Sequence, residues 1–192
     1  MKTARPFTRT SQRVAVLTLS VLGLVNAYAQ TGPFMLSSPD LAMGTFDNKF
    51  VLNGFGCAGG NVSPALEWYN LPKGTKSLSL LVHDPDAPTG SGFWHWVVVN
   101  IPPTVTELPL GAGNPSAGTL PAGALEVRTD FGKPGYGGPC PPEGHPDRYI
   151  FTVSAVSLDK LPVTADSSAA VVGFFLHFNT LAKASLMGLF KR

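Results

Sequence analysis

Three stretches of the chain carry apolar residues over lengths that are typical of β-strands. Residues 77–83 (SLSLLVH) and 93–101 (FWHWVVVNI) lie on either side of a short turn, and residues 148–158 (RYIFTVSAVSL) follow after a long interval. β-Branched and aromatic side chains are frequent in the last two stretches, as they are in strands. Shorter alternations at residues 65–68 and 184–190 predict two more strands. The pattern therefore predicts an antiparallel β architecture.

Outside these strands the pattern is weaker and predicts loops and short elements. Residues 30–53 contain isolated apolar positions that indicate two short strands, and residues 104–125 form a long excursion rich in Gly and Pro. Asp166 or Ser167 can cap a helix that runs to about Leu181. Long ordered loops in compact domains are often functional, so the excursion is a candidate binding surface.

The first thirty residues differ in character from the rest. Four basic residues and no acidic ones precede an apolar run at residues 14–25, and the small residues of a cleavage site follow in Ala27-Tyr28-Ala29. A membrane anchor needs roughly 18 or more apolar residues, and this run is too short for one. The arrangement predicts a signal peptide over residues 1–29 that is removed on export. A single domain over residues 30–192 would then lie in the periplasm or be secreted.

The net charge changes sign once this leader is set aside. The full chain has 14 Lys and Arg against 12 Asp and Glu, and four of the basic residues lie in the leader. The predicted mature chain therefore carries a net charge of −2. A nucleic-acid-binding domain is expected to have a basic face, so the composition argues against that class. No later apolar run is long enough to span a membrane, which limits membrane contact to lipid head groups.

Two cysteines, Cys57 and Cys140, remain in the predicted mature chain. In an oxidising compartment the simplest state of such a pair is a disulfide, which would close a loop of about eighty residues and stabilise the fold by roughly 4 kcal/mol. Two free buried thiols are the alternative. A zinc site is disfavoured because the two cysteines lack the close spacing that zinc ligands usually have.

Most of the chemistry that the sequence offers lies between residues 83 and 101. Asp84 and Asp86 are each tied to a proline, which stiffens the backbone that presents the two carboxylates. A flexible Thr-Gly-Ser-Gly turn then leads into the strand that carries His95. Two acids on a rigid turn therefore face the start of a strand with a histidine. This arrangement predicts the mouth of a pocket.

Two other kinds of site would use the same residues. The acids and histidines of residues 83–95 include possible metal ligands, but nothing in their spacing fixes a tetrahedral or octahedral set, so we expect no metal and no cofactor. A hydrolase would need Ser63 or Ser91 as a nucleophile beside His95 and Asp84. Neither serine lies in a nucleophile elbow of the Gly-x-Ser-x-Gly kind, so we expect no catalysis.

Four motifs in the predicted domain resemble those of the phosphatidylethanolamine-binding protein family, in particular its bacterial branch described as Raf-kinase-inhibitor-like. They are DPDAP, WHWVVVNIP, GYGGPCPPEGHPDRYIFTV and LHFNTLAKASLMGLF, in that order. The resemblance extends from about Gly54 to Phe190. It implies an all-β fold of two packed antiparallel sheets, Greek-key-like, with a few short helices. It also implies a small pocket that binds the phosphate of phosphoethanolamine-like ligands.

The resemblance also implies which residues form this pocket. They are Asp84, Asp86, Ala87, Pro88, His95, Gly138, Pro141, Pro142 and Tyr149. Many relatives have a histidine two residues before the tyrosine, where this chain has Asp147, so an anion takes the place of a possible cation beside the pocket. The family often has a cis peptide before the last proline of DPDAP, which makes Ala87–Pro88 a candidate for one.

Carboxylates in an anion pocket require a physical explanation. They can accept hydrogen bonds from protonated phosphate oxygens, bind the ammonium of an ethanolamine head group, or hold His95 in its charged form. We expect charged His95 and the backbone N–H groups of Gly137 and Gly138 to supply the attraction for an anion. Arg148 is expected to form a structural salt bridge and not to contact the ligand.

Together these features predict an exported ligand-binding protein without catalysis, whose partner is a small anion of the phosphoethanolamine type. The alternative is an inhibitor that blocks a partner enzyme through the pocket-rim loops at residues 104–147, because members of the resembled family are named for inhibiting kinases or proteases. A protein partner and a homodimer are both compatible with the predicted pocket.

Overall fold

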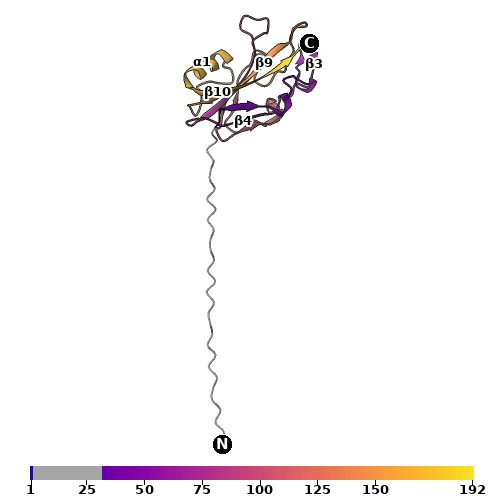
Figure 1. The fold of residues 1–192 in the computed structure, drawn as a ribbon. Helices are drawn as coiled ribbons and strands as arrows, with labels where there is room; N and C mark the ends of the chain where they lie inside the picture. Colours follow the sequence, from indigo (N-terminus) through magenta and orange to yellow (C-terminus); the bar gives the residue numbers. More distant parts are fainter. Residues whose placement is uncertain (2–31) are drawn as a thin grey trace.

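The computed structural model describes residue 1 and residues 32–192, and it shows mostly antiparallel β-structure with one α-helix (Figure 1). The predicted signal peptide lies outside the described residues apart from Met1. In chain order the elements are β1 Met35–Ser37, the 3₁₀ helices η1 Pro39–Leu41 and η2 Asn48–Phe50, β2 Asn53–Gly54, β3 Cys57–Ala58, β4 Leu66–Tyr69, β5 Ser77–Asp84, β6 Phe93–Ile101, β7 Glu107–Leu108, η3 Pro115–Ala117, β8 Leu125–Glu126, β9 Asp147–Val156, α1 Ala169–Asn179 and β10 Thr180–Phe190.

Two main sheets form the body of the fold, and all of their strand pairs are antiparallel. The larger sheet has the order β10-β9-β5-β6-β8, and the smaller one has the order β1-β4-β7. The short β2 and β3 strands form a separate hairpin. The predicted fold class, all-β with two antiparallel sheets and a few short helices, is confirmed.

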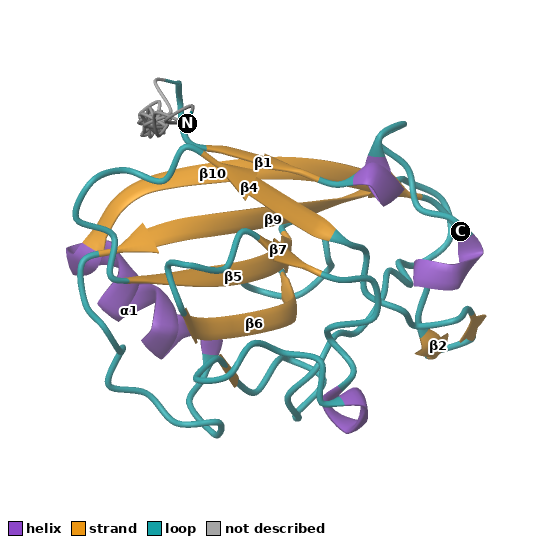
Figure 2. Cartoon of the chain, turned by 90° about the horizontal axis from the view of Figure 1, so that it is seen from below, coloured by secondary structure: helices purple, strands orange, loops and turns teal. Residues whose placement is uncertain are grey.

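The larger sheet is covered on both faces, and each face has its own apolar core. The core between the two sheets contains Trp68 of β4 together with Trp96 and Val98 of β6. The core on the opposite face contains Val97 of β6 and Val172 of α1. Figure 2 shows α1 on one side of this sheet and β1 and β4 on the other. Because both faces are buried, β5 and β6 are buried along most of their length, and β6 appears in the sequence as a nearly continuous apolar run.

The β5–β6 pairing has two register shifts, and at the one nearer the turn β6 carries an extra residue, His95. Val82 pairs with Trp96 and His83 pairs with Trp94, which leaves His95 without a partner on β5. Such a bulge interrupts the regular alternation of side chains. Trp94 therefore packs with the core beside α1, whereas His95 and Trp96 both lie on the side of the inter-sheet core. The bulge directs the histidine away from the helix and toward the cavity described below.

The α-helix is shorter than the sequence predicted, and the strand after it is longer. The cap is Ser168, whose Oγ accepts a hydrogen bond from Val171 N at 3.4 Å. The chain leaves the helix at Thr180, where pairing with Val156 of β9 begins, so β10 starts four residues before the predicted strand at residues 184–190. Among the described residues, no helix has both the length and the apolar character needed to cross a membrane.

Candidate ligand-binding site

Two neighbouring strand ends and a third from a distant part of the sequence meet at one end of the larger sheet and border a cavity of about 130 Å³. β5 ends at Asp84 and β6 begins at Phe93, and these two residues pair across the strands. β9 begins at Asp147 beside them. All the residues that the sequence predicted for the pocket line this cavity except Asp86. Its size suits a head group and not a whole lipid, since pockets for larger ligands span several hundred Å³.

Asp86 holds the acidic turn to β9 and does not line the cavity. Its Oδ2 accepts hydrogen bonds from Arg148 N at 2.9 Å and Nε at 2.8 Å, and its Oδ1 accepts one from Nη2 at 2.7 Å. These bonds lower the pKa of the Asp86 carboxyl to about 2. Arg148 thus forms the structural salt bridge that the sequence predicted, and it takes Asp86 out of the proposed pocket wall.

Asp84 both shapes the turn and lines the cavity. This buried carboxylate uses Oδ1 to accept hydrogen bonds from the backbone N–H groups of Asp86 at 2.8 Å and Ala87 at 3.0 Å. The described residues contain no cis peptide bond, so the cis bond suggested for Ala87–Pro88 is not found. Ala87 and Pro88 nevertheless line the cavity as predicted.

His95 is not the cation that the sequence led us to expect. Its Nδ1 lies 2.8 Å from the carbonyl oxygen of Gly137, which can only accept, so Nδ1 carries the proton. Burial lowers the pKa of His95 despite the opposing effects of that hydrogen bond and of nearby Asp84. The imidazole is therefore neutral at pH 7, and its Nε2 is a hydrogen-bond acceptor.

The backbone donors expected at Gly137 and Gly138 are also engaged within the protein. Gly137 N donates to His95 O at 2.9 Å, and Gly138 N donates to Asn61 Oδ1 at 2.8 Å. Neither N–H group is therefore available to an anion. Both expected sources of attraction for a phosphate are contradicted, although Gly138 itself forms part of the cavity wall.

Two polar groups in the cavity wall make no hydrogen bond of normal geometry within the protein, and the Asp84 side chain lies near both of them. The hydroxyl of Tyr149 and Oδ2 of Asp147 are both buried and unpaired. Burial is the main cause that raises the pKa of Tyr149, and the charge of Asp84 adds to it. Burial, again with Asp84, raises the pKa of Asp147 to about 6. Unsatisfied buried groups of this kind are costly, and both of these border the cavity, where a bound ligand would satisfy them.

Replacing Asp147 with asparagine is expected to stabilise the protein at pH 7.5. The raised pKa means that the folded state binds the Asp147 proton more tightly than the unfolded state does. The resulting stabilisation is complete below about pH 4 and is lost as the pH rises through about 6. Asparagine cannot ionise, so Asp147→Asn should raise the free energy of unfolding by about 1 to 2 kcal/mol at pH 7.5, with a smaller gain at pH 5.

Urea denaturation at the two pH values measures this effect. Asp159→Asn is the matched control, because the Asp159 side chain is exposed and makes only a 3.7 Å ion pair with Lys76. It should change the free energy of unfolding by less than about 0.5 kcal/mol at either pH. An Asp147→Asn variant that is less stable than the wild type at pH 7.5 would show that the buried, ionised carboxylate does not destabilise the folded protein.

Aromatic rings form much of the remaining wall, and sequence reasoning did not predict them as pocket residues. Phe93 packs edge-to-face on Phe131 with ring centroids 4.8 Å apart, and Phe131 packs on His95 at 5.4 Å. Phe55 lies at the rim, exposed over 72% of its surface, with its ring 5.6 Å from that of Phe131.

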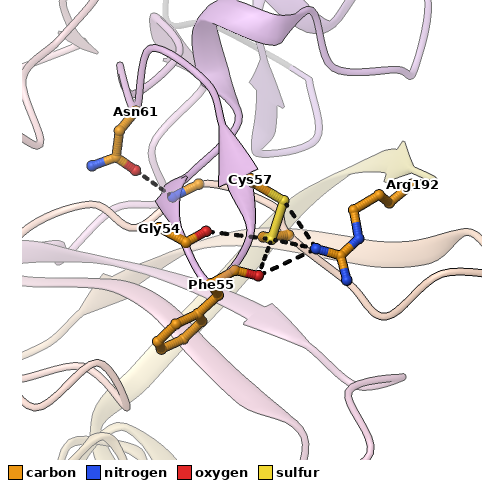
Figure 3. The surroundings of a disulfide bond; sticks show 7 residues. Gly54, Phe55, Cys57, Asn61 and Arg192 are labelled. Atoms are coloured by element: carbon orange, nitrogen blue, oxygen red, sulfur yellow. Dashed lines mark hydrogen bonds between the residues drawn. A yellow bond between two sulfur atoms is a disulfide. The ribbon is translucent and has the colours of Figure 1, made fainter.

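The predicted disulfide between Cys57 and Cys140 is confirmed, and it explains the position of Phe55 (Figure 3). The bridge ties the β2–β3 hairpin to the part of the cavity wall formed by Gly138, Pro141 and Pro142, the Gly-Pro wall, because Cys140 itself lines the cavity next to Pro141. Arg192 Nη1 donates to the carbonyl oxygen of Phe55 at 3.2 Å and lies within 3.8 Å of both sulfur atoms. In the sequence, the signal that could have placed Phe55 near the pocket was its position two residues before Cys57, the predicted disulfide partner of Cys140.

Neither serine considered for a hydrolase lies in the cavity wall. Ser63 is buried, and its Oγ accepts a hydrogen bond from Gly113 N at 2.9 Å. Ser91 is exposed on the turn before β6, where its carbonyl oxygen lies 3.1 Å from Nε2 of His83. His95 therefore has no serine hydroxyl beside it in the cavity.

Comparison with known proteins places this architecture in a family. The family model described as phosphatidylethanolamine-binding protein matches residues 42–191. The chain belongs to this family. The phosphatidylethanolamine-binding protein match covers all the cavity residues named above, and it confirms the resemblance seen in the sequence motifs.

Two Escherichia coli members of the phosphatidylethanolamine-binding protein family are close in sequence. The chain is 47% identical to YbcL over 174 residues, which cover 90% of this chain and 95% of YbcL. It is 49% identical to YbhB over 156 residues, which cover 81% of this chain and 98% of YbhB. The crystal structure of YbcL, described as a new member of the mammalian family, superposes with a TM-score of 0.81 over 84% of this chain and 99% of that one.

Proposed function

We propose that this chain is an exported, non-catalytic binding protein whose cavity takes the compact head group of a phosphoethanolamine-like ligand. The observation that carries the proposal is the convergence of Asp84, His95 and Tyr149, from three separate strands, on one cavity with unpaired polar atoms in its wall. Family membership supports a head-group ligand, and the disulfide supports an oxidising compartment. The proposal of no catalysis is supported by the positions of Ser63 and Ser91 outside the cavity.

A thermal-shift titration with phosphoethanolamine tests the proposal. A ligand that binds only the folded state at 100 times its Kd adds about 2.7 kcal/mol of stability, which corresponds to a rise in Tm of about 5 to 10 °C for a domain of this size. Tyr149→Phe removes only the unpaired buried hydroxyl, so it should leave the Tm of the free protein unchanged or slightly higher. If the hydroxyl contacts the ligand, the variant should bind about tenfold more weakly and show about half the shift.

Tyr69→Phe provides the matched control for this titration. Tyr69 lies on β4 in the smaller sheet, where its hydroxyl donates to Glu67 and not to the cavity. It should retain the full phosphoethanolamine shift. Equal shifts in Tyr149→Phe and the wild type would contradict the site, and release of inorganic phosphate from phosphoethanolamine would contradict the absence of catalysis.

A further inference from the structure

A second groove lies beside α1, on the face of the larger sheet opposite the cavity. It has a volume of about 220 Å³ and shares none of its lining residues with the cavity. Side chains from α1 and from four neighbouring strands line it, among them Trp94 of β6, Leu81 of β5, Ser154 of β9 and Lys183 of β10. The head-group function proposed for the cavity gives this groove no role.

Gly173 keeps the helix side of this groove open. It lies in the middle of α1, where glycine is less favourable than alanine because it loses more conformational freedom on folding. The backbone at Gly173 is not left-handed, and a Cβ there would meet no atom within 4 Å outside its chain neighbours and its own helix backbone. Neither conformation nor close packing therefore requires a glycine. The missing side chain instead leaves space in the groove that Gly173 lines.

An aromatic stack forms the β6 side of the groove. The rings of His83 and Trp94 are stacked with centroids 4.1 Å apart, and His83 Nε2 donates a hydrogen bond to Ser91 O at 3.1 Å, which orients the stack. Leu81 and Leu176 are buried and add aliphatic surface to the wall. Such a wall favours an apolar ligand body, whose contact with the rings and aliphatic groups removes apolar surface from water.

Lys183 supplies positive charge on the opposite side of the groove. Strands β9 and β5 lie between β10 and β6, so Lys183 and Trp94 lie across the groove from each other. Lys183 is exposed and makes no ion pair with the described residues, and no Asp or Glu of that part of the chain lines the groove. Ser154 pairs with Lys183 across β9 and β10, and Thr152 also lines the groove, so two hydroxyl groups lie near the ammonium. An ammonium and hydroxyl donors together favour an anionic group.

We propose that this groove is a second binding site, and that it takes a small amphiphile with an apolar body and one negative charge, of the medium-chain fatty acid class. The apolar body lies between the Trp94 stack and the open face of α1 at Gly173. The carboxylate lies beside Lys183. The inference does not depend on the head-group function of the cavity, and phosphoethanolamine, which has no apolar body of this kind, is not a ligand of the groove.

Titration with sodium octanoate below its micellar concentration, followed by acrylamide quenching of tryptophan fluorescence, tests this site. Trp68 and Trp96 are fully buried, so Trp94 is the one of the three tryptophans that the quencher reaches. Octanoate should protect Trp94 from acrylamide. Octanamide, its neutral counterpart, should bind about fivefold more weakly, because it forms no ion pair with Lys183. Phosphoethanolamine should give no protection.

Two variants with matched controls locate the ligand. Gly173→Leu should weaken octanoate binding at least about tenfold, because the new side chain fills the groove. Ala170→Leu makes a similar change at an exposed position of α1 that does not line the groove, and it should bind octanoate normally. Lys183→Gln should weaken octanoate binding about fivefold and leave octanamide binding unchanged. Lys73→Gln, in the turn before β5, should change neither. Both lysines are exposed, so this second pair tests the site even if Gly173→Leu does not fold.

Contrary results would overturn the inference in distinct ways. Octanoate binding that Gly173→Leu leaves unchanged would mean that the ligand lies elsewhere. Equal affinities of the wild type for octanoate and octanamide would overturn the assignment of an anion. Protection of Trp94 that rises with protein concentration in the absence of octanoate would mean that a second copy of the chain covers the groove, not an amphiphile. The phosphoethanolamine shift of the cavity is measured separately and should be the same in Gly173→Leu as in the wild type.

Discussion

Loss of the Cys57–Cys140 disulfide is expected to lower the free energy of unfolding by about 4 to 5 kcal/mol, the loop-closure contribution of a bridge between residues 83 positions apart. The bridge joins two segments that have little regular structure of their own. The β2–β3 hairpin has only two residues in each strand, and Cys140 lies in a loop. Without the bridge, Phe55 and the Gly-Pro wall are held mainly by isolated hydrogen bonds, such as that from Leu52 N to Pro139 O at 3.1 Å.

Urea denaturation of the double variant Cys57→Ala/Cys140→Ala measures the loss. Wild-type protein in reductant is the matched control, because it lacks the bridge without any change of sequence, and it should unfold at the same urea concentration as the variant. Oxidised wild-type protein should unfold at a higher urea concentration than both. A difference below about 1 kcal/mol between the oxidised and reduced proteins would mean that the unfolded chain is already restrained in this region.

The long strands β6 and β9 were predictable because their residue types favour strands and their side chains are mostly buried, so both properties point to the same structure. β6 and β9 are rich in β-branched and aromatic residues, and the predicted bounds of β6 match the structure at both ends. The helix end was not predictable from local pattern, because residues 176–183 contain no glycine or proline to mark it, and pairing with β9 outweighs helix propensity there. Tertiary pairing decided this boundary, and it is not visible in a short window of sequence.

The site was predictable in its members but not in its charge state. The motif residues converge as expected, since strand ends fix where Asp84, His95 and Tyr149 lie. The protonation of His95 depends on a bulge that buries its ring against Gly137, and no single-residue property of the sequence signals that bulge. Asp147 was visible in the sequence as an anion beside the pocket. Its raised pKa depends on burial next to Asp84, which only the packed structure provides.

Gly138→Ala is expected to cost about 3 kcal/mol or more and to abolish ligand binding. A Cβ at this position would lie 2.1 Å from the carbonyl oxygen of Phe50 and 2.6 Å from the backbone nitrogen of Leu52. Both are main-chain atoms held by hydrogen bonds, from Tyr136 Oη to Phe50 O at 3.1 Å and from Leu52 N to Pro139 O. The clash cannot be relieved by rotating a side chain, so the backbone of the cavity wall must move.

Gly90→Ala is the matched control, because it makes the same change in the turn beside the cavity. A Cβ on Gly90 would have no atom within 4 Å outside its chain neighbours, and the residue does not need a left-handed backbone conformation. It should change the free energy of unfolding by less than about 0.5 kcal/mol and keep the phosphoethanolamine shift. If Gly138→Ala folded with near-normal stability and full binding, the backbone at Gly138 and the backbone at residues 50–52 would be able to move apart. The cavity wall would then lack the rigidity needed to hold the acids and aromatic rings around a ligand.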